Sequence, residues 1–325
     1  MNGRAEKPQA VITQRPFPET VALLSEVADV VANDTNDPWP RDRLLQNARS
    51  AEALMVFMPD SIDEKFLREC PRLKVVAAAL KGYDNFDVAA CSQRGIWFTI
   101  VPDLLSESTA ELALALMLGL ARNMRSGDAL IRAGEFHGWR PILYGNAVKA
   151  STAGMIGFGG VGRALARMLN GFGCTIVHCD PASGDGVPLS KLLAVSDFVL
   201  PLVPLTKQTF HLIDAGTLKQ MKRGAYLVNV SRGSIVDEGA VAAALESGHL
   251  AGYAADTFEM EDWARGDRPR AISPLLLRQA EKTLFTPHLG SAVISVRLAI
   301  ERAAALNICE VLAGRTPPDA VNRPG

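Results

Sequence analysis

The sequence contains few cysteines, and their arrangement excludes two kinds of stabilisation. There are five in 325 residues, and no two have the spacing Cys-x-x-Cys. Small secreted domains stapled by disulfides carry many paired cysteines, and structural zinc sites need closely spaced ones. We therefore expect free thiols, a cytoplasmic protein and no metal site.

Long apolar runs and an excess of charge of either sign are also lacking. The longest apolar run, 112–121, is about half of what a membrane-spanning helix needs. No apolar segment of signal-peptide type precedes the strand pattern at 11–13. A net charge of −1 provides no attraction to nucleic acid or to an anionic membrane. These absences predict a globular protein whose partners include neither nucleic acid nor a membrane.

Short apolar strand patterns alternate with helical patterns in two stretches of the chain. In the first stretch we expect strands at 11–13, 54–58, 75–79 and 97–99, and helices at 18–27, 41–48 and 63–69. In the second we expect strands at 155–156, 176–179, 198–200, 226–229, 252–255 and 284–286. Such alternation predicts an α/β fold with two Rossmann-like domains, each built on a doubly wound parallel sheet.

Two long helical patterns, at 106–122 and 291–313, indicate how the domains are connected, whereas 123–150 reads as irregular. Because the last helix follows the final strand of the second stretch, we expect it to return to the first. A dinucleotide-binding domain, 106–291, is then inserted in a substrate domain made of 1–105 and 292–325. A ligand cleft between the two is the expected active site.

A glycine-rich turn provides the clearest indication of function. The sequence Gly157-Phe158-Gly159-Gly160-Val161-Gly162 follows an apolar strand pattern and opens an amphipathic helix. In this G-x-G-x-x-G spacing, Gly157 permits the bend, Gly159 lets the backbone approach a pyrophosphate, and Gly162 lets the helix pack on the strand. The free N–H groups of the helix N-terminus then attract the phosphates.

An acidic residue follows this turn at the distance that a dinucleotide site requires. Asp180 ends the next predicted strand, 18 residues after Gly162, and no Arg or Lys occurs at 181–183. A carboxylate there accepts hydrogen bonds from the adenosine ribose and repels a 2′-phosphate. The pattern predicts NAD as the cofactor in preference to NADP.

Three polar residues follow successive predicted strands, where open α/β sheets bind ligands. Arg232 can grip an oxyanion through two parallel hydrogen bonds, and a Glu261–His288 pair suits general acid–base catalysis. Each residue alone has a structural alternative: Arg232 can cap a helix or pair with Asp237, Glu261 can be a solvated acid, and His288 can be a turn residue. Their joint placement behind a dinucleotide motif favours an active site.

Three segments resemble the D-2-hydroxyacid dehydrogenase family, and the likeness covers nearly the whole chain. They are N-x-x-R-G-x-x-V-D-E at 229–238, the acid that follows 256–258, and T-P-H-L-G-S at 286–291. The resemblance implies the inserted-domain architecture and a homodimer built on the apolar helix 112–121. It also implies Arg232 as substrate clamp, Glu261 as orienting acid and His288 as acid–base. Whether His288 or Arg232 is the base stays open.

The resemblance further implies which residues contact the ligands. For NAD these are Thr109, Gly157, Gly159, Gly160, Val161, Gly162, Asp180, Val203, Pro204, Val230, Asp256 and Gly290. Asp256 is expected near the nicotinamide carboxamide and Thr109 near the pyrophosphate. For the substrate they are Met58, Lys81, Gly82, Trp139, Tyr144, Ser291 and Arg297.

Within the family, the chain resembles the phosphonate (phosphite) dehydrogenases more closely than the lactate or glycerate enzymes. The segments concerned are 56–60, 80–87, 101–105, 134–141, 253–265, 291–293 and 296–297. Lys81 is the most specific residue, because hydroxyacid dehydrogenases usually have a small neutral residue there. A second cation besides Arg232 suits a compact dianion, although a surface lysine on a strand end is the structural alternative.

The expected reaction is the oxidation of phosphite to phosphate, with hydride transfer from phosphorus to the nicotinamide. The alternative is an NAD-dependent D-2-hydroxyacid dehydrogenase, which shares Arg232, Glu261 and His288; Lys81 and the segments around Trp139 and Trp263 weigh against it. A dinucleotide-sensing binding protein is a third possibility, because fold alone does not specify activity.

Overall fold

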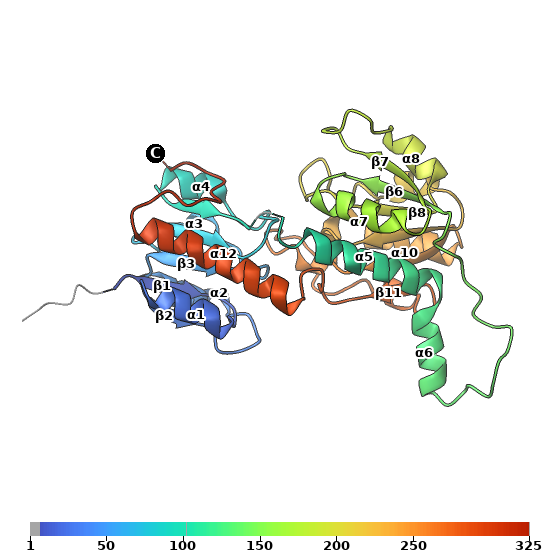
Figure 1. Ribbon diagram of the computed structural model, residues 1–325, viewed down its shortest axis with the longest axis horizontal. Helices are drawn as coiled ribbons and strands as arrows, with labels where there is room; N and C mark the ends of the chain where they lie inside the picture. Colours follow the sequence, from blue (N-terminus) through green and yellow to red (C-terminus); the bar gives the residue numbers. More distant parts are fainter. Residues whose placement is uncertain (1–6, 102, 325) are drawn as a thin grey trace, which may run out of the picture. The chain divides into compact units, whose positions relative to one another are not determined.

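The computed structural model describes residues 7–101 and 103–324, which form two compact units (Figure 1). Unit 1 contains Met1–Leu105 and Val293–Gly325, and unit 2 contains Ser106–Ala292. The expected domain boundaries also include residues 1–6, 102 and 325, which lie outside the described residues. The same holds for Pro102 in the segment 101–105 that carries part of the family resemblance.

Unit 1 is built on a five-stranded parallel sheet with the order β2-β1-β3-β4-β5. Its strands are β1 (Gln9–Ile12), β2 (Asp29–Ala32), β3 (Ala53–Val56), β4 (Val75–Ala78) and β5 (Trp97–Thr99). Helices α1 (Pro18–Ser25) and α12 (Ile294–Leu312) cover one face of the sheet. The other face is covered by α2 (Arg41–Ala48), α3 (Glu64–Arg68) and α4 (Val88–Gln93).

Unit 2 is built on a six-stranded parallel sheet with the order β11-β10-β9-β8-β6-β7. The strands are β6 (Thr152–Ile156), β7 (Thr175–Cys179), β8 (Phe198–Pro201), β9 (Ala225–Asn229), β10 (Leu250–Ala255) and β11 (Thr283–Phe285). One face packs against α5 (Ser106–Ala121) and α7 (Gly160–Asn170). The other packs against α8 (Leu189–Val195), α9 (Ala215–Gln220), α10 (Glu238–Glu246) and α11 (Pro274–Leu277).

These two sheets, each with helices on both faces, confirm the predicted α/β fold class. Every paired strand is parallel, so each connection must cross a face of the sheet, which is why helices alternate with strands. The apolar helix 112–121 lies in α5, where Leu116, Met117 and Leu120 are buried against α7 and the sheet.

Aspartates begin several helices by accepting a hydrogen bond from a backbone N–H of the first turn. The side chains of Asp63, Asp87 and Asp237 each accept from the residue three positions later. Asp214 does the same and forms a reciprocal capping box with Thr217. Such caps satisfy N–H groups that the helix itself leaves unpaired.

The sequence-based prediction was wrong for part of 123–150, where helix α6 (Met124–Arg132) forms. Asn123 adopts a left-handed conformation (φ 52°), which ends α5 and allows a new helix to start in another direction. An ion pair between Asp128 and Arg132 stabilises α6 along its surface. The sequence of α6 places Met124, Leu130 and Ile131 on one face, a helical pattern that the prediction missed, although no residue of α6 is buried in its unit.

In unit 1, two elements, β2 and α4, were not predicted. Both are short, with four and six residues, and β2 is an edge strand with no fully buried residue. Short elements of this kind have weak periodicity.

Unit 1 holds a buried carboxyl group at the point where its strand order reverses. Asp60 follows β3, is 5% exposed, and accepts hydrogen bonds from the Thr13 hydroxyl after β1 and from the Phe57 backbone N–H. β1 and β3 lie side by side, and their carboxyl ends form the switch point of the sheet. Burial raises the pKa of Asp60 from 3.8 to about 6.

This raised pKa predicts a pH dependence of stability that Asp60→Asn removes. Because the folded-state pKa lies above the unfolded value of 3.8, the Asp60 contribution is present at low pH and is lost as pH rises through about 6. Both hydrogen bonds end on Oδ2, which the amide oxygen of Asn replaces. At about 1.4 kcal/mol per pKa unit, the wild-type free energy of unfolding, relative to the variant, should fall by about 2–3 kcal/mol between pH 4 and pH 7.5. Urea unfolding of both proteins at the two pH values measures this. If the wild type and the variant differed in free energy of unfolding by the same amount at pH 4 and pH 7.5, the prediction would be wrong.

Candidate active site

The glycine-rich turn lies between β6 and α7 and leaves room for a pyrophosphate. Gly157 has φ +94°, and a Cβ there would come within 2.6 Å of the Leu202 carbonyl oxygen. A Cβ at Gly162 would lie 3.0 Å from the Gly157 oxygen, whereas Gly159 faces open space. Gly160 and Val161 form the first turn of α7, whose free N–H groups follow this opening. These residues fit a bound dinucleotide.

Asp180 follows β7 and bonds directly to the glycine turn. Its carboxylate accepts hydrogen bonds from the backbone N–H groups of Phe158, at 2.7 Å, and Ala182, at 2.8 Å. These hydrogen bonds lower the pKa of Asp180, so the group is ionised at neutral pH. The Phe158 ring stacks on His178, with ring centroids 4.1 Å apart. A fixed negative charge beside the turn suits the ribose hydroxyls of NAD and disfavours a 2′-phosphate.

Other residues expected to contact the cofactor lie on loops beyond neighbouring strands. Val203 and Pro204 follow β8, and the Val203 side chain packs beside Gly157. Val230 follows β9 and is buried in the core beneath α5 and α7. Thr109, in the first turns of α5, is buried and directs its hydroxyl at the Gly290 carbonyl, 3.4 Å away.

Arg232, Glu261 and His288 follow three strands that are neighbours in the sheet of unit 2. They come after β9, β10 and β11, whose order in the sheet is β11-β10-β9. All three strands are parallel, so their carboxyl ends lie at one edge. This edge is where open α/β sheets bind ligands.

His288 and Glu261 form a hydrogen-bonded pair. His288 Nδ1 lies 2.7 Å from Glu261 Oε2, and Glu261 Oε1 accepts from the Phe258 backbone N–H at 2.8 Å. Because an ionised carboxylate only accepts hydrogen bonds, Nδ1 carries the proton and Nε2 presents its lone pair. The His288 side chain is 32% exposed, which leaves the ring accessible to a substrate.

Asp256 holds the loop that carries His288. Its buried carboxylate accepts from the Thr286 hydroxyl at 2.6 Å, the Leu289 N–H at 2.7 Å and the Gly290 N–H at 2.9 Å. His288 N also donates to the Asp256 carbonyl at 2.9 Å, and His288 has φ +58°. Burial raises the pKa of Asp256, an effect that these hydrogen bonds oppose. The side chain expected near the nicotinamide therefore also shapes the loop that carries His288.

The Arg232 loop packs directly on the loop that leads to Glu261. Asn229 Nδ2 donates to the Arg232 carbonyl at 2.9 Å, and Arg232 Nη1 donates to the Ser231 carbonyl at 3.1 Å. A Cβ at Gly233 would overlap the backbone carbonyl of Phe258. Glycine is therefore required immediately after Arg232.

Four residues expected to bind substrate belong to unit 1. Met58 follows β3, and Lys81 and Gly82 follow β4, at the carboxyl end of the sheet. Lys81 is ion-paired with Asp103. Arg297, on α12, lies over the Phe57 ring, 5.6 Å from its centroid, with Nη1 3.4 Å from the Ala79 carbonyl oxygen. Arg297 and Lys81 thus lie on the same edge of this sheet.

Trp139 and Tyr144 are not part of the edge formed by β9, β10 and β11 in unit 2. Trp139 is 81% exposed and Tyr144 is 75% exposed, and both lie on the segment that follows α6. Figure 1 shows α6 and this green segment projecting from the rest of the unit. Ser291, in contrast, is half-buried and directly follows the loop held by Asp256.

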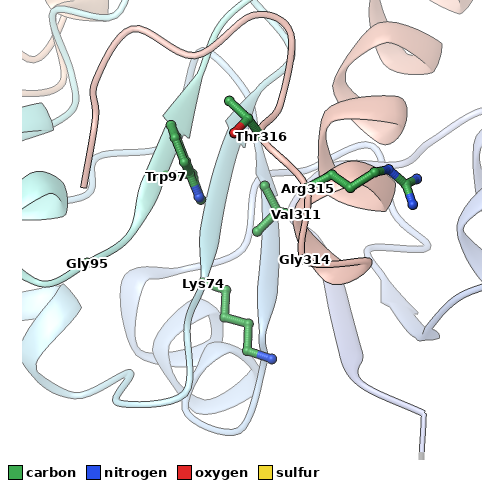
Figure 2. A pocket seen from close by; sticks show the side chains of 7 residues that line it. All are labelled: Lys74, Gly95, Trp97, Val311, Gly314, Arg315 and Thr316. Carbon is green, nitrogen blue, oxygen red and sulfur yellow. The ribbon is translucent and has the colours of Figure 1, made fainter. Parts of the chain in front are cut away.

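Unit 1 has a hollow of about 250 Å³ at the opposite end of its sheet, but its lining does not favour a ligand. It is lined by Lys74, Gly95, Trp97, Val311, Gly314, Arg315 and Thr316 (Figure 2). The two cations are paired, Lys74 with Glu52 and Arg315 with Glu310. Among the described residues there is no cluster suited to hold a metal ion and no helix suited to span a membrane.

Comparisons with known proteins agree with the geometry of the site. Residues 114–290 match the family described as D-isomer specific 2-hydroxyacid dehydrogenase, NAD binding domain. The glyoxylate reductase of Thermococcus litoralis is 35% identical, covering 98% of this chain and 97% of that protein. The chain belongs to the D-isomer specific 2-hydroxyacid dehydrogenase family. The matched residues lie in unit 2, which carries the NAD-binding domain.

Other members of this family show the same likeness over the whole chain. The glyoxylate reductase of Aeropyrum pernix is 36% identical, covering 98% of this chain and 97% of that protein. The crystal structure of the TT0316 protein from Thermus thermophilus has a TM-score of 0.87 at 32% identity, covering 97% and 100% of the two chains. The protein is therefore an NAD-dependent oxidoreductase of the D-2-hydroxyacid dehydrogenase type. None of these three relatives is named for phosphite.

Three residues that join the Arg232 and Glu261 loops were not predicted from the sequence: Ser234, Asp262 and Arg265. Arg265 donates to Ser234 Oγ at 2.6 Å, and Asp262 accepts from Ser234 N at 2.8 Å. The charges at 259–268 have no helical or strand period, so the sequence contains no signal of which ones turn inward.

The His288–Glu261 pair predicts a large effect of Glu261→Gln. The amide retains an acceptor for the Phe258 N–H, but its NH₂ group favours the opposite imidazole tautomer and provides no charge to balance a proton on the ring. We expect kcat to fall by about 10²–10⁴-fold, as steady-state kinetics on the wild-type substrate would measure. Glu281→Gln, at an exposed glutamate, serves as the control. A fall of less than about threefold would remove Glu261 from catalysis.

Proposed function

We propose that the protein oxidises phosphite to phosphate with NAD, and that reduction of a 2-oxoacid such as glyoxylate is the second candidate. Lys81 is the observation that carries the first, because the resemblance puts a cation there where hydroxyacid dehydrogenases usually have a small neutral residue. It follows β4 on the carboxyl edge of the unit 1 sheet, and its side chain is 40% exposed. Its ion pair with Asp103 is the contact that a bound phosphite would replace in this proposal. The names of the relatives favour the second candidate.

The resemblance assigns three cations to the substrate, which is more than a monoanion requires. In unit 2, Arg232 follows β9. In unit 1, Lys81 follows β4, and Arg297 lies beside the carboxyl end of the same strand. A 2-hydroxyacid carries one negative charge, which a single bidentate arginine can neutralise. Phosphite carries two near neutral pH, so additional cations stabilise it more than they stabilise a monoanion.

In the proposed reaction, Arg232 and Lys81 hold the phosphite oxygens, and His288 Nε2 accepts a proton from an attacking water. The water oxygen bonds to phosphorus while the P–H bond breaks with its electron pair. Bound NAD supplies the hydride acceptor. Glu261 keeps the imidazole oriented and balances its positive charge after proton transfer. We assign the base to His288 and not to Arg232, because a guanidinium remains protonated in proteins.

In the second candidate reaction, the same residues act on a carbonyl compound. Arg232 holds the carboxylate of the 2-oxoacid, and the protonated His288 donates its Nε2 proton to the carbonyl oxygen as hydride reaches the carbon. This reaction requires Arg232, Glu261 and His288 but gives no role to a lysine at position 81.

Initial-rate measurements with each substrate separate the two candidates. We expect NADH to form from NAD and phosphite at least about tenfold faster, as kcat/KM, than from D-lactate or D-glycerate, and faster than glyoxylate consumes NADH. In Lys81→Ala we expect the KM for phosphite to rise by about tenfold, as loss of about 1.4 kcal/mol of charge stabilisation implies. Lys74→Ala, at the other end of β4, should leave KM unchanged. Turnover of glyoxylate with no reaction of phosphite would reject the first candidate.

We also propose that the protein acts as a homodimer, as its resemblance to the family implies. The resemblance put the interface on helix 112–121, but Leu116, Met117 and Leu120 of that helix are buried within unit 2, so we propose the exposed apolar residues that follow it instead. Apolar side chains are exposed along α6 and the segment after it, including Ile131, at 60%, and Phe136, at 55%. Trp139, at 81%, is exposed on the same segment, and a second copy of the chain would cover these apolar side chains.

Sedimentation velocity tests this proposal. We expect the wild type to sediment as a dimer and Phe136→Ser/Trp139→Ser to shift toward monomer by at least about tenfold in Kd, since each buried aromatic contributes a few kcal/mol. Val195→Ser, at an exposed apolar residue elsewhere in unit 2, is the control. A monomeric wild type at micromolar concentration would refute the dimer.

A further inference from the structure

We propose that Arg265 is a positioning residue that locks the loop of Arg232 to the loop of Glu261. The inference rests on the proposed role of Arg232 as substrate clamp and deepens it. Arg265 lies on the segment that follows Glu261, and it is half-buried, with a side chain 21% exposed. Its guanidinium reaches back to the residues immediately after Arg232.

The central contact is a hydrogen bond from Arg265 to Ser234. Arg265 Nη1 donates to Ser234 Oγ at 2.6 Å, and Ser234 is fully buried two residues after Arg232. A charged donor makes such a bond about twice as strong as a neutral one. It therefore ties the Arg232 loop to a residue of the neighbouring loop.

The remaining surfaces of the guanidinium are also engaged, which fixes its position. Its plane lies over the Phe210 ring, with Cζ 4.4 Å from the centroid. Nε and Nη2 donate to the two oxygens of Asp267, at 3.3 and 3.2 Å. Only a planar, forked cation can make these contacts together, so lysine cannot replace Arg265.

The backbone of Ser234 is held from two further directions. Ser234 N donates to Asp262 Oδ2 at 2.8 Å, and Ser234 O accepts from His211 N at 2.7 Å. Asp262 directly follows Glu261, so this bond also joins the two loops. Gly233 packs against the Phe258 backbone with no room for a Cβ. The side chain, N–H and carbonyl of Ser234 are thus all bonded.

Two buried acids lie beneath this junction and require nearby positive groups. Glu259 Oε2 lies 3.0 Å from His211 Nε2 and 3.8 Å from Arg265 Nη1. Glu238 and Glu259 each accept the backbone N–H of the other, at 3.0 and 3.2 Å. Without Arg265, Glu259 keeps its contact with His211 and its hydrogen bond from the Glu238 N–H, so the expected effect of its loss is loosening of the loop and not unfolding.

Arg268 provides a matched control in the same segment. It also stacks on an aromatic ring, with Cζ 4.4 Å from the centroid of Trp263, and Nε donates to the Met260 carbonyl at 2.9 Å. Both contacts stay within 260–268 and do not include the Arg232 loop. Arg268→Ala therefore removes an arginine–aromatic contact but leaves the bond between Arg265 and Ser234 in place.

Hydrogen–deuterium exchange on the full-length protein tests the lock without any substrate. In Arg265→Ala we expect the amides at 233–236 to exchange about tenfold faster, as loss of a charge-assisted hydrogen bond of about 1.4 kcal/mol or more implies. Arg265→Lys should exchange nearly as fast as Arg265→Ala, and Arg268→Ala should match the wild type. Wild-type exchange in Arg265→Ala, or full protection by lysine, would overturn the proposal.

Kinetics then test the consequence for the clamp. In Arg265→Ala we expect KM for the oxyanion substrate to rise about tenfold, with partial recovery on addition of guanidinium at millimolar concentration. KM in Arg268→Ala should be unchanged. An unchanged KM in Arg265→Ala would overturn the positioning role. If the wild type acts on neither phosphite nor a 2-hydroxyacid or 2-oxoacid, the proposed function fails, but the exchange experiment still decides whether the lock exists.

Discussion

The buried Asp256 carboxylate is the interaction on which the site in unit 2 depends. It ends β10 and accepts three hydrogen bonds from 286–290, which places the loop after β11 against the loop after β10. Without them, His288 would have no reason to hold a left-handed conformation next to Glu261. A buried charge is stable there because each oxygen has donors from this loop.

The same principle, polar groups that join loops at one sheet edge, recurs elsewhere in unit 2. Ser234 accepts from Arg265 and donates to Asp262, which joins the loops after β9 and β10. Asp180 accepts from Phe158, which joins the loops after β6 and β7. Parallel strands bring these loops together, but their side chains determine the relative positions. The positions of Arg232, Glu261 and His288 therefore depend on other side chains in the neighbouring loops.

Much of the fold and part of the site could be predicted from the sequence, for local reasons. The glycine turn, the acid after β7 and the alternation of strands with helices are encoded within short windows. Two elements were missed for different reasons: β2 is a four-residue edge strand, too short for a clear period, whereas α6 has an apolar face that the prediction did not use. The apolar face of α6 is exposed in its unit, so periodicity indicates a helix there without showing what covers it.

The amino-acid sequence alone was enough to establish the fold class, the NAD-binding turn and the positions of Arg232, Glu261 and His288 after successive strands. The contacts between loops came from the folded chain: Nδ1 of His288 faces Glu261, Asp256 holds the catalytic loop, and Arg265 reaches Ser234, 31 residues away. The reason is physical: a motif records which residues the backbone places in one turn, whereas contacts between loops depend on strand order and on which charges turn inward to satisfy buried partners.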